Sequence, residues 1–352
     1  MIPESKLATL RAKLKDATNP LFLFDDDLDG LCSFLLLRRF TGCGVWHVVK
    51  AKPIIDESLL PAVGRTKPDL VVVLDKPDIE QVFLDSLPCE AIWIDHHSPV
   101  ERAKVDYYNP LCYTSTYTPT TAVCWAAVDG PLWIAAAGCI GDWALPEFLP
   151  KIVAERPDLF PSMPTEPGQV VYDFPFGKVM AALSSCLKGK GQDVRRATAA
   201  LTKIEQPDEI LNESSSAGAL VSRKYKKFSQ LYRALFDQAA RQRARNNLFV
   251  FVYSGPHAFG GELANELAWR MPKKVVLIGR EKAGWVRLSL RAGRAWPVPI
   301  REALLTALKG IKGYGGGHPL ACGANVKRED LDRFLTQFAA EIDQVLKRSA
   351  LH

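Results

Sequence analysis

The sequence predicts an α/β protein in which a domain built on a parallel sheet is followed by a helical connector and a smaller α/β domain. From residue 20 to about residue 142, short apolar runs alternate with helical patterns, as expected for successive β-α units. The length of 352 residues suits about two domains. A hydrophobic content of 47% allows each of them a core.

Four buried strands are expected in the first domain, because four short apolar runs are each followed by polar residues or glycine. They lie at residues 21–24, 45–49, 70–74 and 91–94. Three of them lead directly into an aspartate, namely Asp25, Asp75 and Asp95. Because the carboxyl ends of parallel strands meet at one edge of a sheet, we expect these three acids to lie in one crevice.

An acidic cluster lies between the first strand and an apolar helix predicted at residues 31–40. It consists of Asp25, Asp26, Asp27, Asp29 and the glycine that follows, Gly30. Neighbouring carboxylates repel one another unless a cation neutralises them, which favours metal binding over a solvated acidic turn. An EF-hand loop is a further alternative, but the twelfth residue from Asp25 is Leu36, where that motif needs a glutamate.

The triplet Asp95-His96-His97 follows the fourth strand. It offers two imidazoles together with a carboxylate that can orient one of them, although paired structural histidines are the simpler alternative. Asp75 alone would more often be a helix cap. Gly141-Asp142 follows a helix of small residues, and by itself this pair would not indicate a function.

A basic helical pattern predicts the connector. Residues 214–246 form one long pattern whose cations are Arg223, Lys224, Lys226, Lys227, Arg233, Arg241, Arg243 and Arg245. The aromatic side chains at three- and four-residue spacing favour a core-facing stripe over a base-stacking platform. We therefore expect a first domain at residues 1–212, a connecting helix at 213–246 and a second domain at 247–352.

The second domain contains a predicted anion-binding strand. Its strands are expected at residues 248–253, 275–278 and 286–290, and its helices at 262–270 and 330–346. Arg287, Ser289 and Arg291 alternate with apolar residues and should share one face. A glycine run then precedes His318 and comprises Gly315, Gly316 and Gly317. Such glycines let backbone amides approach a phosphate, although a flexible turn is the alternative.

Composition and charge limit the classes of protein that remain. Lys+Arg 45 against Asp+Glu 39 gives a net charge of +6, which permits an anionic partner without requiring one. The eight cysteines show no C-x-x-C pair or zinc-type spacing and are expected to be reduced. The charged N-terminus lacks the apolar core of a signal peptide, and no apolar stretch reaches the roughly 20 residues of a membrane span. We expect a cytoplasmic protein.

These motifs, in this order, resemble those of the DHH phosphoesterase family. The four motifs of the first domain are the Asp-x-Asp-Gly segment after a strand, the strand-ending Asp75, the triplet Asp95-His96-His97 and Gly141-Asp142. Residues 119–122 also resemble the family's segment between its third and fourth motifs. Residues 313–323 resemble the GGGH signature of the DHH-associated C-terminal domain. That domain follows the catalytic domain in RecJ-like nucleases, nanoRNases and cyclic-dinucleotide phosphodiesterases, so the resemblance covers most of the chain.

The resemblance implies a two-metal centre with Asp75 as a bridging ligand. The first ion would be held by Asp25, Asp27 and Asp75, and the second by Asp29, Asp75, His96 and Asp142. His97 would face the scissile phosphate, Asp95 would orient the imidazoles, and Arg291 and His318 would hold a terminal phosphate or nucleotide.

Manganese is the usual ion of this family. The family commonly has histidine at the place of Asp25, so the first site here would offer oxygen ligands only. Carboxylates favour harder ions, which would shift preference toward Mg²⁺ or weaken the first site.

The expected function is that of a RecJ-like exonuclease or nanoRNase acting by two-metal hydrolysis on single-stranded DNA, RNA or short oligonucleotides. A cyclic-dinucleotide phosphodiesterase is the enzymatic alternative. A non-catalytic replication or repair scaffold is the alternative from another class. Association with replication or repair proteins or with further copies of the chain stays open at this point, as do the choice between DNA and RNA and the direction of cleavage.

Overall fold

The computed structural model describes residues 2–50 and 52–349, and the chain divides into two compact units, Met1–Phe228 and Ser229–His352. The division falls within the long helix α12 (Ser216–Ala240), which extends over less of the chain than the predicted pattern at 214–246. Apolar residues in its first half pack into the core of the first unit, and those in its second half pack into the second unit. Three of the four aromatic side chains in the predicted stripe, Tyr225, Tyr232 and Phe236, take part in this packing. The fourth, Phe228, belongs to neither core cluster and has the ammonium of Lys224 over its ring.

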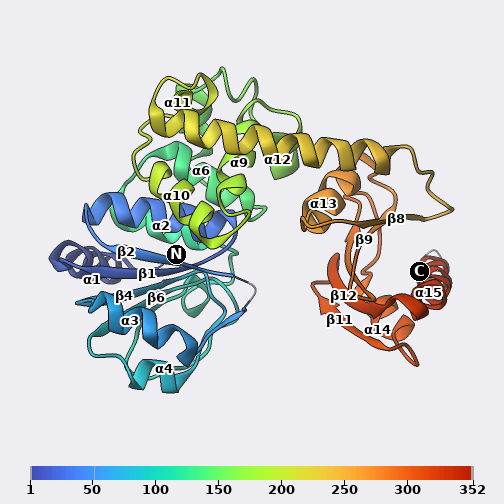
Figure 1. The fold of residues 1–352 in the computed structure, drawn as a ribbon, viewed down its shortest axis with the longest axis horizontal. Coiled ribbons are helices and arrows are strands. Elements are labelled where there is room, and N and C mark those ends of the chain that lie inside the picture. The colour runs from blue at the N-terminus through green and yellow to red at the C-terminus, as the bar shows by residue number, and fades with distance from the viewer. Residues whose placement is uncertain (1, 51, 350–352) are drawn as a thin grey trace. The chain divides into compact units, whose positions relative to one another are not determined.

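Sheet A of the first unit has five parallel strands in the order β2-β1-β4-β6-β7, of which Figure 1 labels β2, β1, β4 and β6. They are β1 (Pro20–Asp25), β2 (Val45–Val49), β4 (Leu70–Leu74), β6 (Glu90–Ile94) and β7 (Asp106–Tyr108). The four predicted strands are present to within one residue at each end. The edge strand β7 was not predicted, because its sequence Asp-Tyr-Tyr contains no apolar run.

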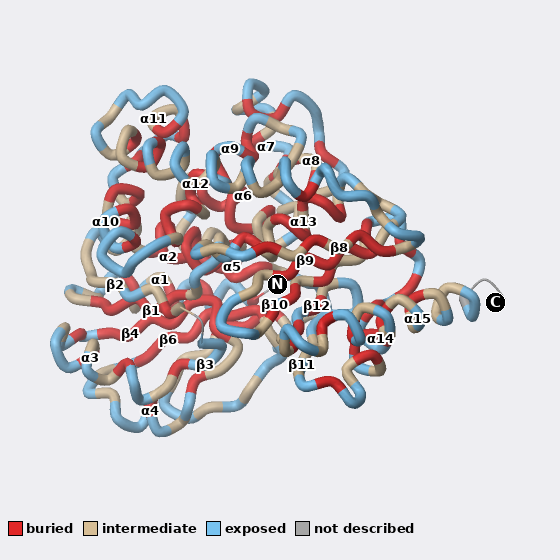
Figure 2. The backbone as a smooth tube through the Cα atoms, turned by 45° about the vertical axis from the view of Figure 1, so that its right-hand side comes forward, coloured by how far each residue is buried: buried red, intermediate tan, exposed pale blue. Residues whose placement is uncertain are grey.

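Helices cover both faces of sheet A, and this explains why its central strands β1, β4 and β6 are apolar along most of their length. Alternate residues such as Phe22, Phe24 and Val72 pack with α2 (Leu28–Thr41), α5 (Thr120–Val128) and α6 (Leu132–Gly141). The residues between them pack with α3 (Leu60–Thr66) and α4 (Gln81–Asp85). Figure 2 shows the resulting buried layer along β1, β4 and β6. The ends of these strands are therefore fixed by packing on two sides.

The remaining elements of the first unit are short. They are α1 (Glu4–Asp16), β3 (Ile54–Ile55), η1 (Glu57–Leu59), β5 (Asp78–Ile79), η2 (Pro110–Cys112), α7 (Leu149–Glu155), α8 (Pro167–Tyr172), α9 (Phe176–Cys186), α10 (Gly191–Leu201) and α11 (Asp208–Leu211). No helix in the described part of the chain is both long and apolar enough to cross a membrane.

The second unit is the smaller α/β domain that the sequence predicts. Sheet C has the order β11-β12-β10-β9-β8, in which only the β8–β9 pair is parallel. Its strands are β8 (Leu248–Ser254), β9 (Val275–Lys282), β10 (Trp285–Ala292), β11 (Gly313–Gly317) and β12 (Ala321–Lys327). Helix α13 (Gly260–Arg270) packs on one face, whereas α14 (Arg301–Ala307) and α15 (Leu331–Ser349) pack on the other, and η3 (Arg328–Asp330) precedes α15.

Candidate metal centre

Three aspartates lie at the carboxyl edge of sheet A, where the central strands end side by side. Asp25 ends β1, Asp75 follows β4 and Asp95 follows β6, and these strands are neighbours in the sheet. Asp75 has a φ of 57°, in the left-handed region that aspartate tolerates better than most residues. Its backbone N–H donates to the carbonyl of Ile94 at 2.9 Å, which ties this turn to β6.

The acidic loop after β1 begins helix α2. Asp27 is the N-cap, and its carboxylate accepts a hydrogen bond from the N–H of Gly30 at 2.9 Å. Asp29 is buried and accepts from the backbone N–H groups of Thr120 at 2.8 Å and Thr121 at 2.7 Å, at the start of α5. These amides stabilise a negative charge that would otherwise be costly to bury.

Gly30 permits a close approach between α2 and the end of β1. A Cβ atom at this position would lie 2.8 Å from both the backbone N and O of Asp25. Side chains essentially never come so close to backbone atoms, so glycine is required here for packing rather than for an unusual φ angle. Close packing therefore explains why the motif has glycine after Asp29.

Three sets of side chains offer metal-ligating atoms that lie within 4.8 Å of one another. The sets are Asp25, Asp27, Asp75; Asp29, His96, Asp142; and Asp75, His96, His97. His96 links them, because its Nε2 lies 3.4 Å from Asp75 Oδ1 and its Nδ1 lies 3.4 Å from Asp142 Oδ2. The structure thus brings together every residue that the family resemblance assigns to the two ions. Mixed carboxylate and imidazole ligands of this kind suit Mn²⁺ or Mg²⁺.

Asp95 fixes the orientation of the His97 ring. The buried Asp95 carboxylate accepts a hydrogen bond from the backbone N–H of His97 at 2.9 Å and contacts Nδ1 of the His97 ring at 2.8 Å. Burial would lower the pKa of His97, but the hydrogen bond and the charge of Asp95 outweigh it, so the pKa is raised. With Nδ1 bonded to Asp95, the ring is oriented and Nε2 is the nitrogen that can exchange a proton at the edge of the site.

The carboxylates of the cluster hold protons more tightly than ordinary aspartates. Burial and the charges of neighbouring acids raise the pKa values of Asp29 and Asp75 well above the usual range. Loss of solvent around the Asp27 carboxylate, followed by repulsion from Asp25, raises the pKa of Asp27 to about 6, although Asp27 is an exposed residue. A cation would relieve this repulsion.

Protons and metal ions should therefore compete for the cluster. Because the raised pKa of Asp27 is about 6, we expect the affinity for Mn²⁺ to be at least about tenfold lower at about pH 5 than at about pH 7.5.

In the metal-free protein a raised carboxylate pKa stabilises the folded state at low pH, and this contribution to the free energy of unfolding is lost as pH rises through about 6. Added Mn²⁺ should consequently raise the melting temperature more at the higher pH. Isothermal titration and thermal melts at both pH values test this, and equal Mn²⁺ affinity at the two would contradict it.

Residues that the sequence did not single out complete the centre. Lys76, which follows Asp75, is fully buried, and its Nζ lies 2.9 Å from Asp25 Oδ1. Tyr117 donates a hydrogen bond to Asp142 Oδ2, and its ring meets that of His96 edge to face with centroids 5.3 Å apart. A lysine directly after a strand-ending aspartate was a signal for the first contact. Nothing in the pattern around Tyr117 indicates the second.

Three buried cysteines lie beside the centre, on the helices that support it. Cys32 belongs to α2, Cys124 to α5 and Cys139 to α6. Burial, together with the negative charge of Asp29, raises the pKa of each thiol above its ordinary value. None of them belongs to the sets of candidate ligands found among the described residues.

In the second unit, Arg287, Ser289 and Arg291 share the face of β10 that is not packed on α14 and α15, as the alternation predicts. Arg287 is exposed, whereas Arg291 donates from Nε to Asn265 Oδ1 at 2.5 Å and from Nη1 to two backbone carbonyls. Part of the Arg291 guanidinium is thus committed to contacts within the unit. Arg287 is the more accessible of the two arginines.

The glycine run forms an edge strand instead of a turn. Gly315, Gly316 and Gly317 belong to β11 and pair with β12, where Gly316 faces Gly323, which in turn faces Ser289 of β10. A Cβ at Gly316 would meet nothing within 4 Å, so the backbone here is open to a ligand. His318 follows the strand and is exposed, with its backbone N–H donating to Ala321 O at 2.9 Å.

A polar row crosses sheet C next to these glycines. Arg280, Arg287, Asn325 and Tyr314 are cross-strand partners on β9, β10, β12 and β11, so they lie on one face. Tyr314 is 69% exposed, and its hydroxyl lies 3.4 Å from Asn325 Nδ2. An exposed aromatic ring on the same face of the sheet as two arginines is a combination that suits the bases and phosphates of a single strand.

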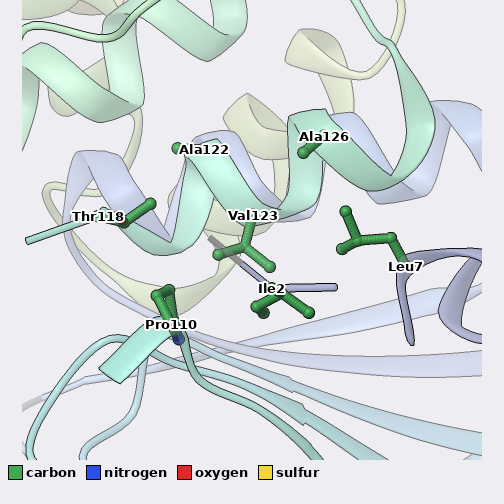
Figure 3. Close-up of a pocket in the computed structure, with 7 residues that line it drawn as sticks. All are labelled: Ile2, Leu7, Pro110, Thr118, Ala122, Val123 and Ala126. Atoms are coloured by element: carbon green, nitrogen blue, oxygen red, sulfur yellow. The ribbon is translucent and has the colours of Figure 1, made fainter. Parts of the chain in front are cut away.

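The pocket drawn in Figure 3 is not part of the metal centre. Its lining is almost entirely apolar and contains none of the cluster's acids: Ile2, Leu7, Pro110, Thr118, Ala122, Val123 and Ala126. Ile2 and Leu7 face Val123 of α5 in this view, so the pocket belongs to the packing of the N-terminal segment on that helix.

Comparison with known proteins shows one family model that the chain matches and several solved structures with a similar fold. Residues 260–344 match the family model of the DHHA1 domain. Among solved structures, the chain is similar to RecJ from Thermus thermophilus in complex with Mn²⁺, with 19% identity over 96% of this chain and 55% of that chain and a TM-score of 0.65. It is also similar to a manganese-bound exonuclease RecJ, with 17% identity over 96% of this chain and 94% of that chain and a TM-score of 0.55.

CDC45 from Entamoeba histolytica shares the fold as well, with 10% identity over 97% of this chain and 98% of that chain and a TM-score of 0.51. No curated protein sequence matches the chain. The chain spans 55% of the length of the Thermus RecJ. The chain carries a DHHA1 domain at residues 260–344, and it shares the fold of the RecJ structures.

Proposed function

We propose that this protein is a metal-dependent phosphodiesterase that removes nucleotides from the end of single-stranded nucleic acid, as a RecJ-like exonuclease or an oligonucleotide-degrading nanoRNase. The observation that carries this proposal is the pair of ligand sets around Asp25, Asp27, Asp75 and around Asp29, His96, Asp142, which meet through the contact between His96 and Asp75. Many enzymes that hydrolyse phosphodiesters use two adjacent metal ions. Support also comes from structures of similar fold that are described as RecJ with Mn²⁺ or Mg²⁺.

The side chains around the cluster suit this chemistry. Bound Mn²⁺ or Mg²⁺ would be held by Asp25, Asp27, Asp29, Asp75, His96 and Asp142, and would activate water and neutralise charge that develops on the phosphate. Asp95 fixes the ring of His97 through Nδ1. His97 Nε2 can therefore donate a hydrogen bond or a proton to a phosphate oxygen at the edge of the site.

The second unit supports a nucleic acid substrate over a small phosphomonoester. Its polar row combines two arginines, an asparagine and an exposed tyrosine, and it lies beside the open backbone of Gly316. We propose that this face holds the substrate strand, with Arg287, Ser289, Arg291, His318 and the backbone of Gly315, Gly316 and Gly317 as its contacts. Exposed cations on α12, including Arg223, Lys226 and Lys227, add positive charge suited to a phosphate backbone.

Digestion of end-labelled DNA and RNA oligonucleotides with Mn²⁺ and with Mg²⁺ tests the proposed function. We expect progressive release of mononucleotides from one end, and the label position gives the direction. Cleavage only of cyclic dinucleotides would favour the cyclic-dinucleotide phosphodiesterase. Internal cuts without shortening from an end would contradict exonuclease action.

A non-catalytic scaffold is a second candidate, favoured by the ion pair between Lys76 and Asp25. This pair places a positive side chain in the set of carboxylates proposed for the first ion. Under this alternative the protein would bind oligonucleotides and metal without hydrolysing any of the substrates above. The same digestion, run beside a binding assay, separates the two candidates.

Arg287→Ala should weaken substrate binding with little effect on the chemical step. The side chain is exposed on the proposed binding face, outside the metal centre. We expect KM for a single-stranded oligonucleotide to rise about tenfold with kcat nearly unchanged. The slope of the logarithm of the binding constant against the logarithm of salt concentration should become shallower by about one, as expected for the loss of one phosphate contact. Arg348→Ala, on the helix that packs against the other face of sheet C, removes the same charge and should have no effect. Equal losses in the two variants would show that only net charge matters.

A further inference from the structure

The ammonium of Lys76 occupies a defined position at the edge of the cluster. The side chain is fully buried, and its Nζ contacts Asp25 Oδ1 at 2.9 Å and the carbonyl of Lys52 at 2.5 Å. The backbone of Lys76 is held as well, because its carbonyl accepts a hydrogen bond from Trp93 Nε1 at 2.9 Å. A lysine this deeply buried needs its partners, since burying an unpaired charge is costly. Lys76 therefore does not behave as a mobile surface cation.

The two ligand sets consequently differ in charge. In the set of Asp25, Asp27 and Asp75, one carboxylate is already paired with an ammonium. A divalent ion bound there would have to share Asp25 with Lys76 and would lie close to a like charge. In the other set, Asp29 is hydrogen bonded by the neutral amides of Thr120 and Thr121, and His96 supplies a nitrogen ligand.

We propose that Lys76 acts as a fixed positive charge in the first ligand set, so that the protein binds one divalent ion tightly and the second much more weakly. The tight ion is held by Asp29, Asp75, His96 and Asp142, and the weak one by Asp25, Asp27 and Asp75. This inference rests on the proposed metal centre and adds the order in which its two ions bind. The free metal concentration then decides whether the second ion, at Asp25, Asp27 and Asp75, is bound as well.

Titration of the full-length protein with Mn²⁺ alone tests the proposal without reference to activity. Free Mn²⁺ is counted by electron paramagnetic resonance, and the heat of binding is measured in parallel. We expect the wild-type protein to bind two ions in separate steps whose dissociation constants differ by about tenfold or more, as expected for a like charge a few ångströms from one of two ions. In Lys76→Met we expect the weaker step to tighten by about tenfold or more, while the tight step changes little.

Lys52→Met is the matched control. Its side chain is bonded to Asp56 and Ser58, so the substitution removes one positive charge from the neighbouring loop without removing the contact to Asp25. Both binding steps should stay within about twofold of wild type, because exposed charges are screened by solvent. Circular dichroism establishes whether each variant is folded.

The outcomes separate the inference from the proposed function. If the wild-type protein does not bind Mn²⁺, both the proposed metal centre and the inference about Lys76 are wrong. Two equal steps in the wild-type protein would overturn the inference and leave the metal centre intact, and this result does not depend on any variant folding. An unchanged or weakened second step in a folded Lys76→Met protein would likewise show that Lys76 is only a structural partner of Asp25.

Discussion

Asp75→Asn should lower phosphodiester hydrolysis by about 10³-fold or more, because a neutral carboxamide cannot bridge two cations as a carboxylate does. Asp75 is the acid whose oxygen contacts His96 Nε2, and it belongs to two of the three ligand sets, one with Asp25 and Asp27 and one with His96 and His97. The substitution keeps the size of the side chain. Asparagine also tolerates the left-handed φ of 57° at this position, so the fold should be retained.

Asp129→Asn is the control for this substitution. Asp129 is exposed at the end of α5 and also has a left-handed φ, of 49°, but it lies outside the acidic cluster. Turnover of labelled oligonucleotides and the number of bound Mn²⁺ ions are measured for both variants. The assignment of Asp75 as bridging ligand fails if the Asp75→Asn protein turns over like wild type.

Gly30→Ala is expected to destabilise the protein by about 3 kcal/mol, at the upper end of what overpacking usually costs. The added Cβ would meet the backbone of Asp25 at 2.8 Å, and backbone cannot move aside as the end of a flexible side chain can. Either α2 or the end of β1 must shift. Metal binding should therefore weaken together with stability, because Asp25 and Asp27 lie on the two sides of this contact.

Gly64→Ala provides the comparison. Gly64 is also helical, in α3, but it is exposed and a Cβ there would meet nothing within 4 Å. Alanine is favoured over glycine within helices, so this variant should be as stable as wild type or more stable by about 0.5–1 kcal/mol. Urea unfolding measures both variants. Equal stability of Gly30→Ala and wild type would show that the backbone can relax and that Gly30 is not required by packing.

The sequence was most informative where buried strands end in acids. Short apolar runs located β1, β4 and β6, and the general rule for parallel sheets predicted that Asp25, Asp75 and Asp95 would meet at one edge. The alternation in β10 likewise predicted the shared face of Arg287, Ser289 and Arg291. These predictions depend on local patterns and on topology, both of which are visible in one sequence.

The contacts that complete the centre depend on three-dimensional neighbours and were not predictable in the same way. Tyr117 reaches Asp142 only because η2 and the segment after it pass beside the end of α6. The strand β11 was missed because glycine has a low strand propensity, and only its pairing with β12 makes it a strand. The contact of Lys76 with Asp25 was not predicted, because a lysine after a strand is usually exposed and only the packing of the fold buries this one.

The buried cysteines beside the centre are sulfur atoms that a metal ion or an oxidant could attack only as thiolates. Zinc and copper are soft enough to favour sulfur, but they bind the thiolate, which requires loss of the proton. The raised pKa values of Cys32, Cys124 and Cys139 keep these thiols neutral. Burial, which is the main cause of these raised pKa values, therefore disfavours the reaction of the three thiols with thiophilic metals and with oxidants, since both react with the thiolate.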